Sequence, residues 1–143
     1  MNRPGVGVLV ILKYKDLILM GQRKGSHGHG EWAFPGGHLE LNESPEECAK
    51  RELLEETNID ISMYTPINLG YTNDIFCSDK KHYITLFFIY NVNELFTPIL
   101  NEPDKCFQWK WVNKNNMPDP LFLSVKNIMT NNIFLEETSI LRS

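Results

Sequence analysis

Three glutamates, Glu52, Glu55 and Glu56, lie three and four residues apart in the segment "RELLEETNI". If this segment is helical, a rotation of about 100° per residue places the three carboxylates on one face. Like charges at this spacing repel one another, and the negative end of the helix dipole disfavours anions near the C-terminus. A solvated helix face is the simpler interpretation, but it leaves both costs in place. A divalent cation such as Mg²⁺, which prefers carboxylate oxygens, removes both.

The residues around these glutamates carry the start and stop signals of a helix. Ser44 is a favourable N-cap, Pro45 suits the first helical position, and Glu47 completes an S-x-x-E capping box. Asn58 can adopt the left-handed conformation that closes a helix. We therefore predict a helix that begins at Pro45 and ends near Thr57.

Two consecutive glycines, Gly36 and Gly37, precede this helix in "PGGHLE". Glycine permits backbone conformations that are closed to other residues, so a main-chain carbonyl or amide can approach a ligand closely. A glycine turn beside a carboxylate face is typical of a metal–phosphate site.

The rest of the chain is predicted to be mainly β-structure, with a short connection over 13–16, a glycine-rich loop over 23–30 and a final helix over Pro120–Ile133. The runs typical of strands are Val6–Leu12, Leu17–Met20, Glu31–Phe34, a part of Pro66–Ile75, His82–Val92 and Phe107–Val112. This order of strands, helix, strands and helix favours a layered α/β (α+β) fold.

Composition is that of a soluble globular protein. The chain has 143 residues, 42% of them hydrophobic and 22% charged, so we expect a single domain over 1–143. A net charge of -4 gives no support for binding a nucleic acid polymer or a membrane surface, and no apolar run has transmembrane length. Cys48, Cys77 and Cys106 are widely spaced, which favours free thiols and a cytoplasmic location.

The spacing of the glutamate segment resembles the Nudix box, G-x5-E-x7-R-E-U-x-E-E-x-G-U, where U is aliphatic. The match begins at Gly37 and ends at Ile59, and Asn58 stands at its final glycine. Segments such as "GQRKGSHGHGEWAFPGGHLE", "HYITLFF" and "NEPDKC" extend the resemblance over nearly the whole chain. They are similar to the MutT-like branch that sanitises nucleotide pools, which includes a hydrolase of thiopurine triphosphates.

The resemblance implies an α/β/α sandwich with a mixed β-sheet, and hydrolysis of a nucleoside diphosphate linked to a further group. It implies Mg²⁺, or Mn²⁺ in its place, as the cofactor. Members of this branch are often homodimers, so a homodimer is an expected assembly, and a small nucleotide is the expected substrate.

The resemblance also assigns roles within the box. Glu52, Glu56 and the carbonyl of Gly36 are the expected metal ligands, and Glu55 is a further or water-mediated ligand. The general base is Glu52 or Glu55, and the residues alone leave this choice open. Arg51 is expected to hold the carboxylates by bidentate pairing.

Three sets of residues outside the catalytic glutamates complete these expectations. Glu43 is expected to brace the box. Glu102 and Asp104 are candidates for a ligand or base outside it, although a loop role is the better explanation of each. The residues expected to bind substrate are Arg23 and His38 at the phosphates, Gly37 beside them, and Phe34, Thr85 and Leu123 around the base.

Two other functions remain open at this point. The same chemistry could act on another diphosphate, such as NADH or a prenyl diphosphate. A non-catalytic nucleotide-binding module is the third interpretation, but such modules usually lose box carboxylates, and this chain keeps them all.

Overall fold

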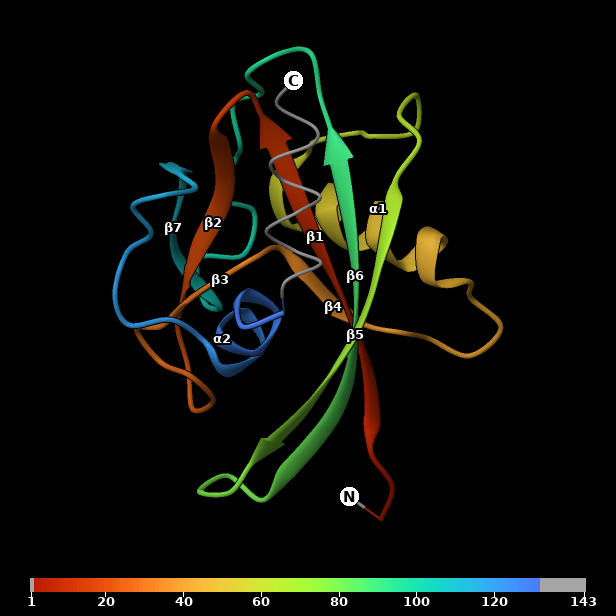
Figure 1. The fold of residues 1–143 in the computed structure, drawn as a ribbon, viewed down its shortest axis with the longest axis vertical. Coiled ribbons are helices and arrows are strands. Elements are labelled where there is room, and N and C mark those ends of the chain that lie inside the picture. The colour runs from red at the N-terminus through yellow and green to blue at the C-terminus, as the bar shows by residue number, and fades with distance from the viewer. Residues whose placement is uncertain (1, 132–143) are drawn as a thin grey trace.

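The computed structural model describes residues 2–131, which form a seven-stranded mixed β-sheet and two α-helices (Figure 1). Along the chain the elements are β1 (Gly5–Tyr14), β2 (Leu17–Arg23), β3 (Trp32–Ala33), β4 (Gly36–His38), α1 (Pro45–Thr57), β5 (Ile67–Phe76), β6 (Lys81–Asn91), β7 (Cys106–Asn113) and α2 (Leu123–Met129). No helix among these residues is long and apolar enough to cross a membrane. The expectation of a single domain over 1–143 stays a prediction.

Strand β1 organises the sheet. The strand order is β3-β2-β1-β6-β5, with β4 paired to β1 and β7 paired to β2. β1 runs parallel to β6 from Gly5↔Tyr83 to Lys13↔Asn91, whereas its pairings with β2 and β4 are antiparallel. Because Val8 pairs with Gly37 and Leu9 with Gly36, the two glycines lie beside the central strand of the sheet.

The two helices cover opposite faces of the sheet. The alternation of side chains along β1 sends Val8, Val10 and Leu12 into a core shared with α1, and Ile11 into a second core shared with α2. The α1 core includes Cys48, Ala49, Leu53, Phe88 and Tyr90, and the α2 core includes Phe34, Phe87, Phe122, Val125 and Ile128. The predicted α/β/α arrangement with a mixed sheet is confirmed.

Helix α1 has the predicted bounds and caps. The Ser44 hydroxyl accepts a hydrogen bond from the Glu47 N–H at 3.1 Å, and the Glu47 carboxylate accepts one from the Ser44 N–H at 2.9 Å. Asn58 closes the helix with a φ of 64°, and its N–H donates to the Leu54 carbonyl at 2.9 Å. Local sequence signals are enough to define this element, because each cap is made by residues within four positions of it.

The C-terminal helix is shorter than predicted. The expected helix over Pro120–Ile133 is wrong at its start, because α2 begins at Leu123. The backbone before it pairs with β3 instead: Trp32 N–H donates to the Pro120 carbonyl at 2.8 Å, and Phe122 N–H donates to the Trp32 carbonyl at 2.9 Å. The end of the expected helix, at 132–133, lies outside the described residues.

The remaining differences concern strand bounds and the double glycine. The expected strands are found within one to three residues of their predicted bounds, except that the expected strand at 31–34 is only two residues long. Gly36–His38, which we expected to form a turn, is a short strand on β1. This pairing holds the backbone of both glycines against β1.

Candidate active site

A pocket of about 830 Å³, including its open mouth, lies against the sheet between β4, α1 and the residues around α2. Its lining combines ionisable side chains with aromatic and small polar ones. The ionisable side chains include Arg23, His38, Glu56, Asp74, Glu102 and Lys105, and the others include Phe34, Tyr83, Thr85, Phe122 and Ser124. A pocket of this character suits a ligand with a phosphate end and a ring.

Glu56 is fixed at the pocket wall by the double glycine. Its Oε1 accepts a hydrogen bond from the Gly36 N–H at 3.0 Å, which joins the last turn of α1 to β4. The Glu52 carboxylate lies one turn earlier and fills the space that a side chain at position 37 would occupy, because a Cβ there would approach its atoms to 2.3–2.6 Å. Gly37 is therefore required for this placement of Glu52.

Burial and like charge act together on these two carboxylates. Burial raises the pKa of Glu56 well above its usual range, and the neighbouring charges of Glu52 and Glu102 raise it further. Burial also raises the pKa of Glu52, although hydrogen bonding from Arg51 opposes this shift. A cation bound between Glu52 and Glu56 would therefore stabilise the ionised form of both carboxylates.

Arg51 joins the acidic side chains beside the pocket. Its Nε donates to Glu43 at 2.6 Å, and its Nη1 donates to Glu52 at 2.7 Å and lies 3.4 Å from Glu55. Its Nη2 also donates to the His38 carbonyl at 3.2 Å. The hydrogen bond from Arg51 lowers the pKa of Glu43 to about 2, so this pair stays charged. The expected bracing contacts of Arg51 and Glu43 are thus present in the structure.

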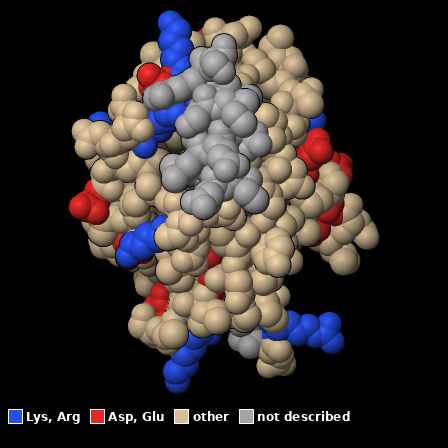
Figure 2. Space-filling view, viewed as in Figure 1, with Lys and Arg blue, Asp and Glu red and all other residues tan. Residues whose placement is uncertain are grey.

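The acidic side chains of this region collect on one side of the molecule. In Figure 2 they gather at the edge where α1 and the segment before it lie in Figure 1. Of the box glutamates, Glu56 lines the pocket, whereas Glu52, Glu55 and Arg51 lie outside its lining. Glu55 is half-exposed.

A loop after β6 supplies a fourth carboxylate. The N–H groups of Ile99 and Asn101 donate to the carbonyls of Thr57 and Glu56, and the Asn101 side chain donates to the Glu55 carbonyl at 3.1 Å. These bonds satisfy carbonyls that a helix C-terminus leaves unpaired. They also bring the next residue, Glu102, into the pocket lining, whereas Asp104 stays exposed outside it.

The carboxylates around the pocket suit a hard divalent cation that is held partly by the protein and partly by the phosphates of a bound molecule. Within residues 2–131 no three His, Cys, Asp or Glu side chains converge closely enough to hold a metal ion alone. Mg²⁺ in phosphate-transfer sites usually uses one or two carboxylates together with substrate phosphates and waters. Two partly buried carboxylates with raised pKa values beside a glycine backbone fit this kind of site.

The two residues expected at the phosphates both line the pocket. The Arg23 guanidinium lies 4.1 Å above the Phe122 ring, and its Nε donates to the His27 carbonyl at 3.1 Å. His38 stacks on Tyr83, with ring centroids 5.2 Å apart. Partial burial lowers the pKa of His38, so its ring is neutral near pH 7 and can donate one hydrogen bond.

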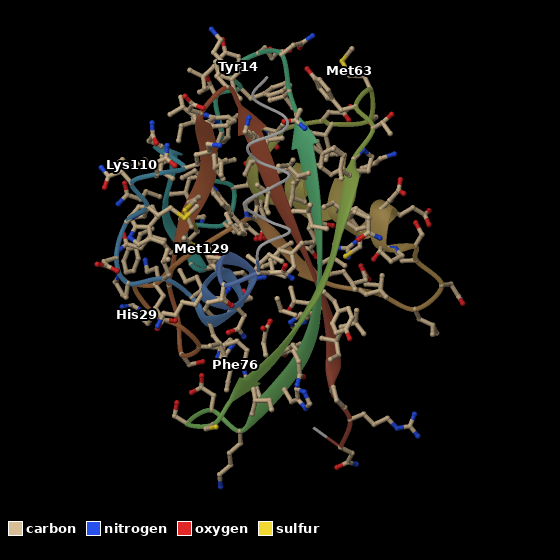
Figure 3. The ribbon with its side chains drawn as sticks, viewed as in Figure 1. Tyr14, His29, Met63, Phe76, Lys110 and Met129 are labelled. Carbon is tan, nitrogen blue, oxygen red and sulfur yellow. The ribbon has the colours of Figure 1, made fainter. Side chains whose placement is uncertain are left out.

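The residues expected around the base are only partly brought together. Phe34 and Thr85 line the pocket, but Leu123 does not; its neighbours Phe122 and Ser124 line it on either side. Phe76, which lies on β5 below α2 in Figure 3, adds an aromatic ring that packs on Phe122 with centroids 5.2 Å apart.

Sequence reasoning missed several polar residues of the lining, which include Lys105, Tyr83, Asp74 and Ser124. Asp74 lies on β5, fully buried, and accepts hydrogen bonds from Thr85 and Asn127. A polar residue at an inward position of a strand is the signal that could have found it. The bulge between Asn68 and Gly70 changes the alternation of β5, which hides this signal in the sequence.

Comparison with known proteins gives a family match and similar folds. The model of the NUDIX domain family matches residues 1–131. An 8-oxo-dGTP diphosphatase of Proteus vulgaris is 43% identical over 53 residues, which are 37% of this chain and 47% of that protein. The chain therefore spans about half the length of this relative.

Two solved structures share the fold. The crystal structure of a MutT NUDIX hydrolase from Burkholderia pseudomallei has a TM-score of 0.79 at 23% identity, covering 89% of this chain and 99% of that one. A bifunctional NMN adenylyltransferase/ADP ribose pyrophosphatase from Francisella tularensis, complexed with AMP and a Mn ion, has a TM-score of 0.77 at 28% identity. That match covers 96% of this chain and 43% of the other.

Proposed function

The chain belongs to the NUDIX domain family, and we propose that it is a pyrophosphohydrolase that hydrolyses nucleoside triphosphates to a monophosphate and pyrophosphate. The observation that carries this proposal is the placement of Glu56, held by the Gly36 N–H at the wall of a pocket that also has aromatic rings. A carboxylate metal site beside an apolar slot suits a nucleotide, whose phosphates and base need different surroundings.

Mg²⁺ is the proposed cofactor, with Mn²⁺ as a substitute. Glu52, Glu56 and the Gly36 carbonyl would hold it, with Glu55 as a water-mediated ligand and Glu102 as a ligand from outside the box. When bound, a divalent ion lowers the pKa of a coordinated water and neutralises phosphate charge. The Francisella structure with AMP and a Mn ion supports this type of cofactor.

The chain's own groups orient the substrate and move the proton. Arg23 and His38 contact the phosphates from one side of the pocket, and Phe34 packs on the base. Of the two candidates for general base, Glu52 is better supported than Glu55. Glu52 lies against Gly37, a pocket-lining residue, and burial raises its pKa toward the working range of a base, whereas Glu55 is half-exposed.

The proposal extends to the biological setting. Nucleotide-pool sanitation, with oxidised or otherwise modified purine deoxynucleotides as substrates, follows from the similarity to the Proteus vulgaris 8-oxo-dGTP diphosphatase and from the motifs shared with the thiopurine-triphosphate branch. We place the protein in the cytoplasm, in agreement with its three free cysteines. A homodimer, the common assembly in this branch, is the state we expect in light scattering.

The proposal is tested by measuring pyrophosphate release from a panel of normal and oxidised nucleoside triphosphates, with and without Mg²⁺. We expect metal-dependent release, and we expect Glu56→Gln to lower turnover by about three orders of magnitude while the fold persists. Glu46→Gln, in the exposed first turn of the same helix, is the matched control and should keep its activity.

Three results would separate the alternatives. Equal turnover by the Glu56→Gln protein contradicts the assignment of the metal site. Turnover of NADH or a prenyl diphosphate, with none of the triphosphates, changes the substrate class. Tight nucleotide binding without hydrolysis of any compound identifies a non-catalytic binding module.

A further inference from the structure

A fully buried carboxylate lines the pocket away from the box glutamates. Asp74 is 0% exposed, and its Oδ2 accepts a hydrogen bond from the Thr85 hydroxyl at 2.5 Å. Its Oδ1 accepts one from the Asn127 side-chain amide at 2.8 Å. Within residues 2–131 no Lys, Arg or His forms an ion pair with Asp74. An ionised carboxylate in such a place is costly unless its acceptor capacity is used.

Anchoring of α2 explains only part of this arrangement. The bond from Asn127 joins α2 to β5, but an asparagine at position 74 could accept the same bond without placing a charge in the core. A carboxylate has about four acceptor sites, and two of them are used by Thr85 and Asn127. These two bonds therefore leave two further acceptor sites on a residue that lines the pocket.

Two buried donors of the same pocket also lack partners. The Ser124 hydroxyl and the Trp109 indole N–H are buried and make no hydrogen bond within the described part of the chain, and both residues line the pocket. Ser124 is 1% exposed. A buried polar group without a hydrogen-bond partner is unfavourable, so a ligand that pairs with such a group gains affinity. Ser124 begins the α2 segment that packs on β5, so its hydroxyl is the donor on the same side of the pocket as Asp74, whereas Trp109 lies on β7, beyond β2.

We propose that Asp74 selects nucleotides whose base has a guanine-type edge. This inference rests on the proposed function, because it needs a nucleotide in this pocket. Guanine presents two adjacent donors, N1–H and the 2-amino group, which a carboxylate accepts together, and its O6 is an acceptor for the Ser124 hydroxyl. 8-Oxoguanine keeps the same edge.

The other common bases fit this site less well. Adenine and cytosine place a ring nitrogen lone pair against the carboxylate, and thymine and uracil flank a single N–H with two carbonyls. A site built to pair with a substrate's N–H groups rejects analogues that lack them far more strongly than a pocket of apolar groups does. The Asp74 carboxylate thus acts as a specificity residue, while the box glutamates act on the phosphates.

Substrate variation tests the proposal without altering the protein. We expect kcat/KM for pyrophosphate release to be about 100-fold higher for dGTP than for dATP. dITP, which lacks the 2-amino group, and 1-methyl-dGTP, which lacks N1–H, should each lose at least about tenfold relative to dGTP. Equal rates with dGTP and dATP, or full activity on 1-methyl-dGTP, would overturn the proposal.

A variant pair separates base selection from anchoring. Asp74→Asn presents one acceptor and one donor, which match the adenine edge, so we expect the dGTP/dATP ratio of kcat/KM to fall by about 100-fold. Asn127→Ala removes the anchoring bond but keeps the carboxylate, so it should lower the melting temperature and leave the ratio within a few-fold. Equal loss of the ratio in both variants would show that Asp74 only anchors α2, and would overturn the proposal.

Binding of monophosphates keeps this test independent of hydrolysis. Titration calorimetry with dGMP, dIMP and dAMP should give the same order of affinity in the wild-type protein. The protein could prefer dGMP, lose this preference in Asp74→Asn, and yet hydrolyse no triphosphate. That result supports base selection and contradicts the proposed reaction. Hydrolysis without preference among the bases supports the reaction and contradicts base selection, and the absence of both binding and hydrolysis contradicts both.

Discussion

Glu56 shows how a locally unfavourable residue can be explained by the site it serves. It lies in the last turn of α1, where the helix dipole disfavours an anion, and it is buried near Glu52 and Glu102. The Gly36 N–H is its only hydrogen-bond donor among the described residues. The spacing of the glutamates in the sequence predicts the electrostatic cost of placing Glu56 there. The sequence does not predict the burial that increases this cost, because burial depends on β4 and on the loop that carries Glu102.

The raised pKa of Glu56 predicts how stability depends on pH in the metal-free protein. Because the folded protein binds the Glu56 proton more tightly than the unfolded chain does, the contribution of Glu56 to stability is greatest at acidic pH. It falls as the pH rises from about 4.3, the unfolded value, through the raised folded pKa. Glu43 acts in the opposite direction: its contribution is present above about pH 4.3 and is lost as the pH falls through its folded pKa of about 2. Between pH 5 and pH 8 Glu43 therefore stays ionised. The raised pKa values of Glu56 and Glu52 lower stability as the pH rises in this interval, and the lowered pKa of His38 opposes them. Comparison of the wild type with Glu56→Gln separates the contribution of Glu56.

Calorimetry at pH 5 and pH 8 checks this. We expect Mg²⁺ to raise the melting temperature more at pH 8, because it binds the ionised carboxylates. Without metal at pH 8, Glu56→Gln should be more stable than the wild type by about 1 kcal/mol, or ~3 °C, because it removes a buried charge. A metal effect that is equal at both pH values, or a less stable metal-free variant, contradicts the prediction.

At the scale of elements, α1 and α2 differ in how far sequence determines them. The start and end of α1 are set by its own caps, Ser44 and Asn58, so its bounds were predicted without error. The start of α2 is set by distant backbone pairing between Trp32 and the residues before the helix, and Phe122 provides no side-chain cap. Non-local pairing of this kind leaves no periodic signal in the sequence.

The contact between β4 and α1 gives a prediction at this scale. In Gly37→Ala the new Cβ would overlap the Glu52 carboxylate, which must move away from Arg51 and the pocket wall. We expect kcat to fall by about 10–100-fold with little change in melting temperature. Pyrophosphate release and thermal unfolding measure the two quantities.

Ser44→Ala is the matched comparison for this variant. It removes the bond that the Ser44 hydroxyl accepts from the Glu47 N–H but keeps the bond from the Ser44 backbone N–H to the Glu47 carboxylate, so it should cost about 1 kcal/mol of stability and leave kcat unchanged. Wild-type turnover by the Gly37→Ala protein would contradict the placement of Glu52, because a displaced carboxylate could not support the reaction equally well.

At the scale of the whole molecule, the sheet brings the site together from distant parts of the chain. The parallel pairing of β1 with β6 places Thr85 beside Gly7, and β4 on the other edge of β1 places the double glycine near α1. The box residues could be predicted because they lie within one short segment. Asp74 and Ser124 could not, because their place in the pocket depends on the packing of β5 against α2.

The position of the metal ion tests the central proposal most directly. Crystals grown with Mn²⁺ and a non-hydrolysable nucleoside triphosphate analogue would locate the ion by its anomalous scattering. We predict an ion bound by Glu56, Glu52 and the Gly36 carbonyl and in contact with the phosphates. An ion bound elsewhere, or Glu52 and Glu56 turned away from the phosphates toward bulk water, would contradict it.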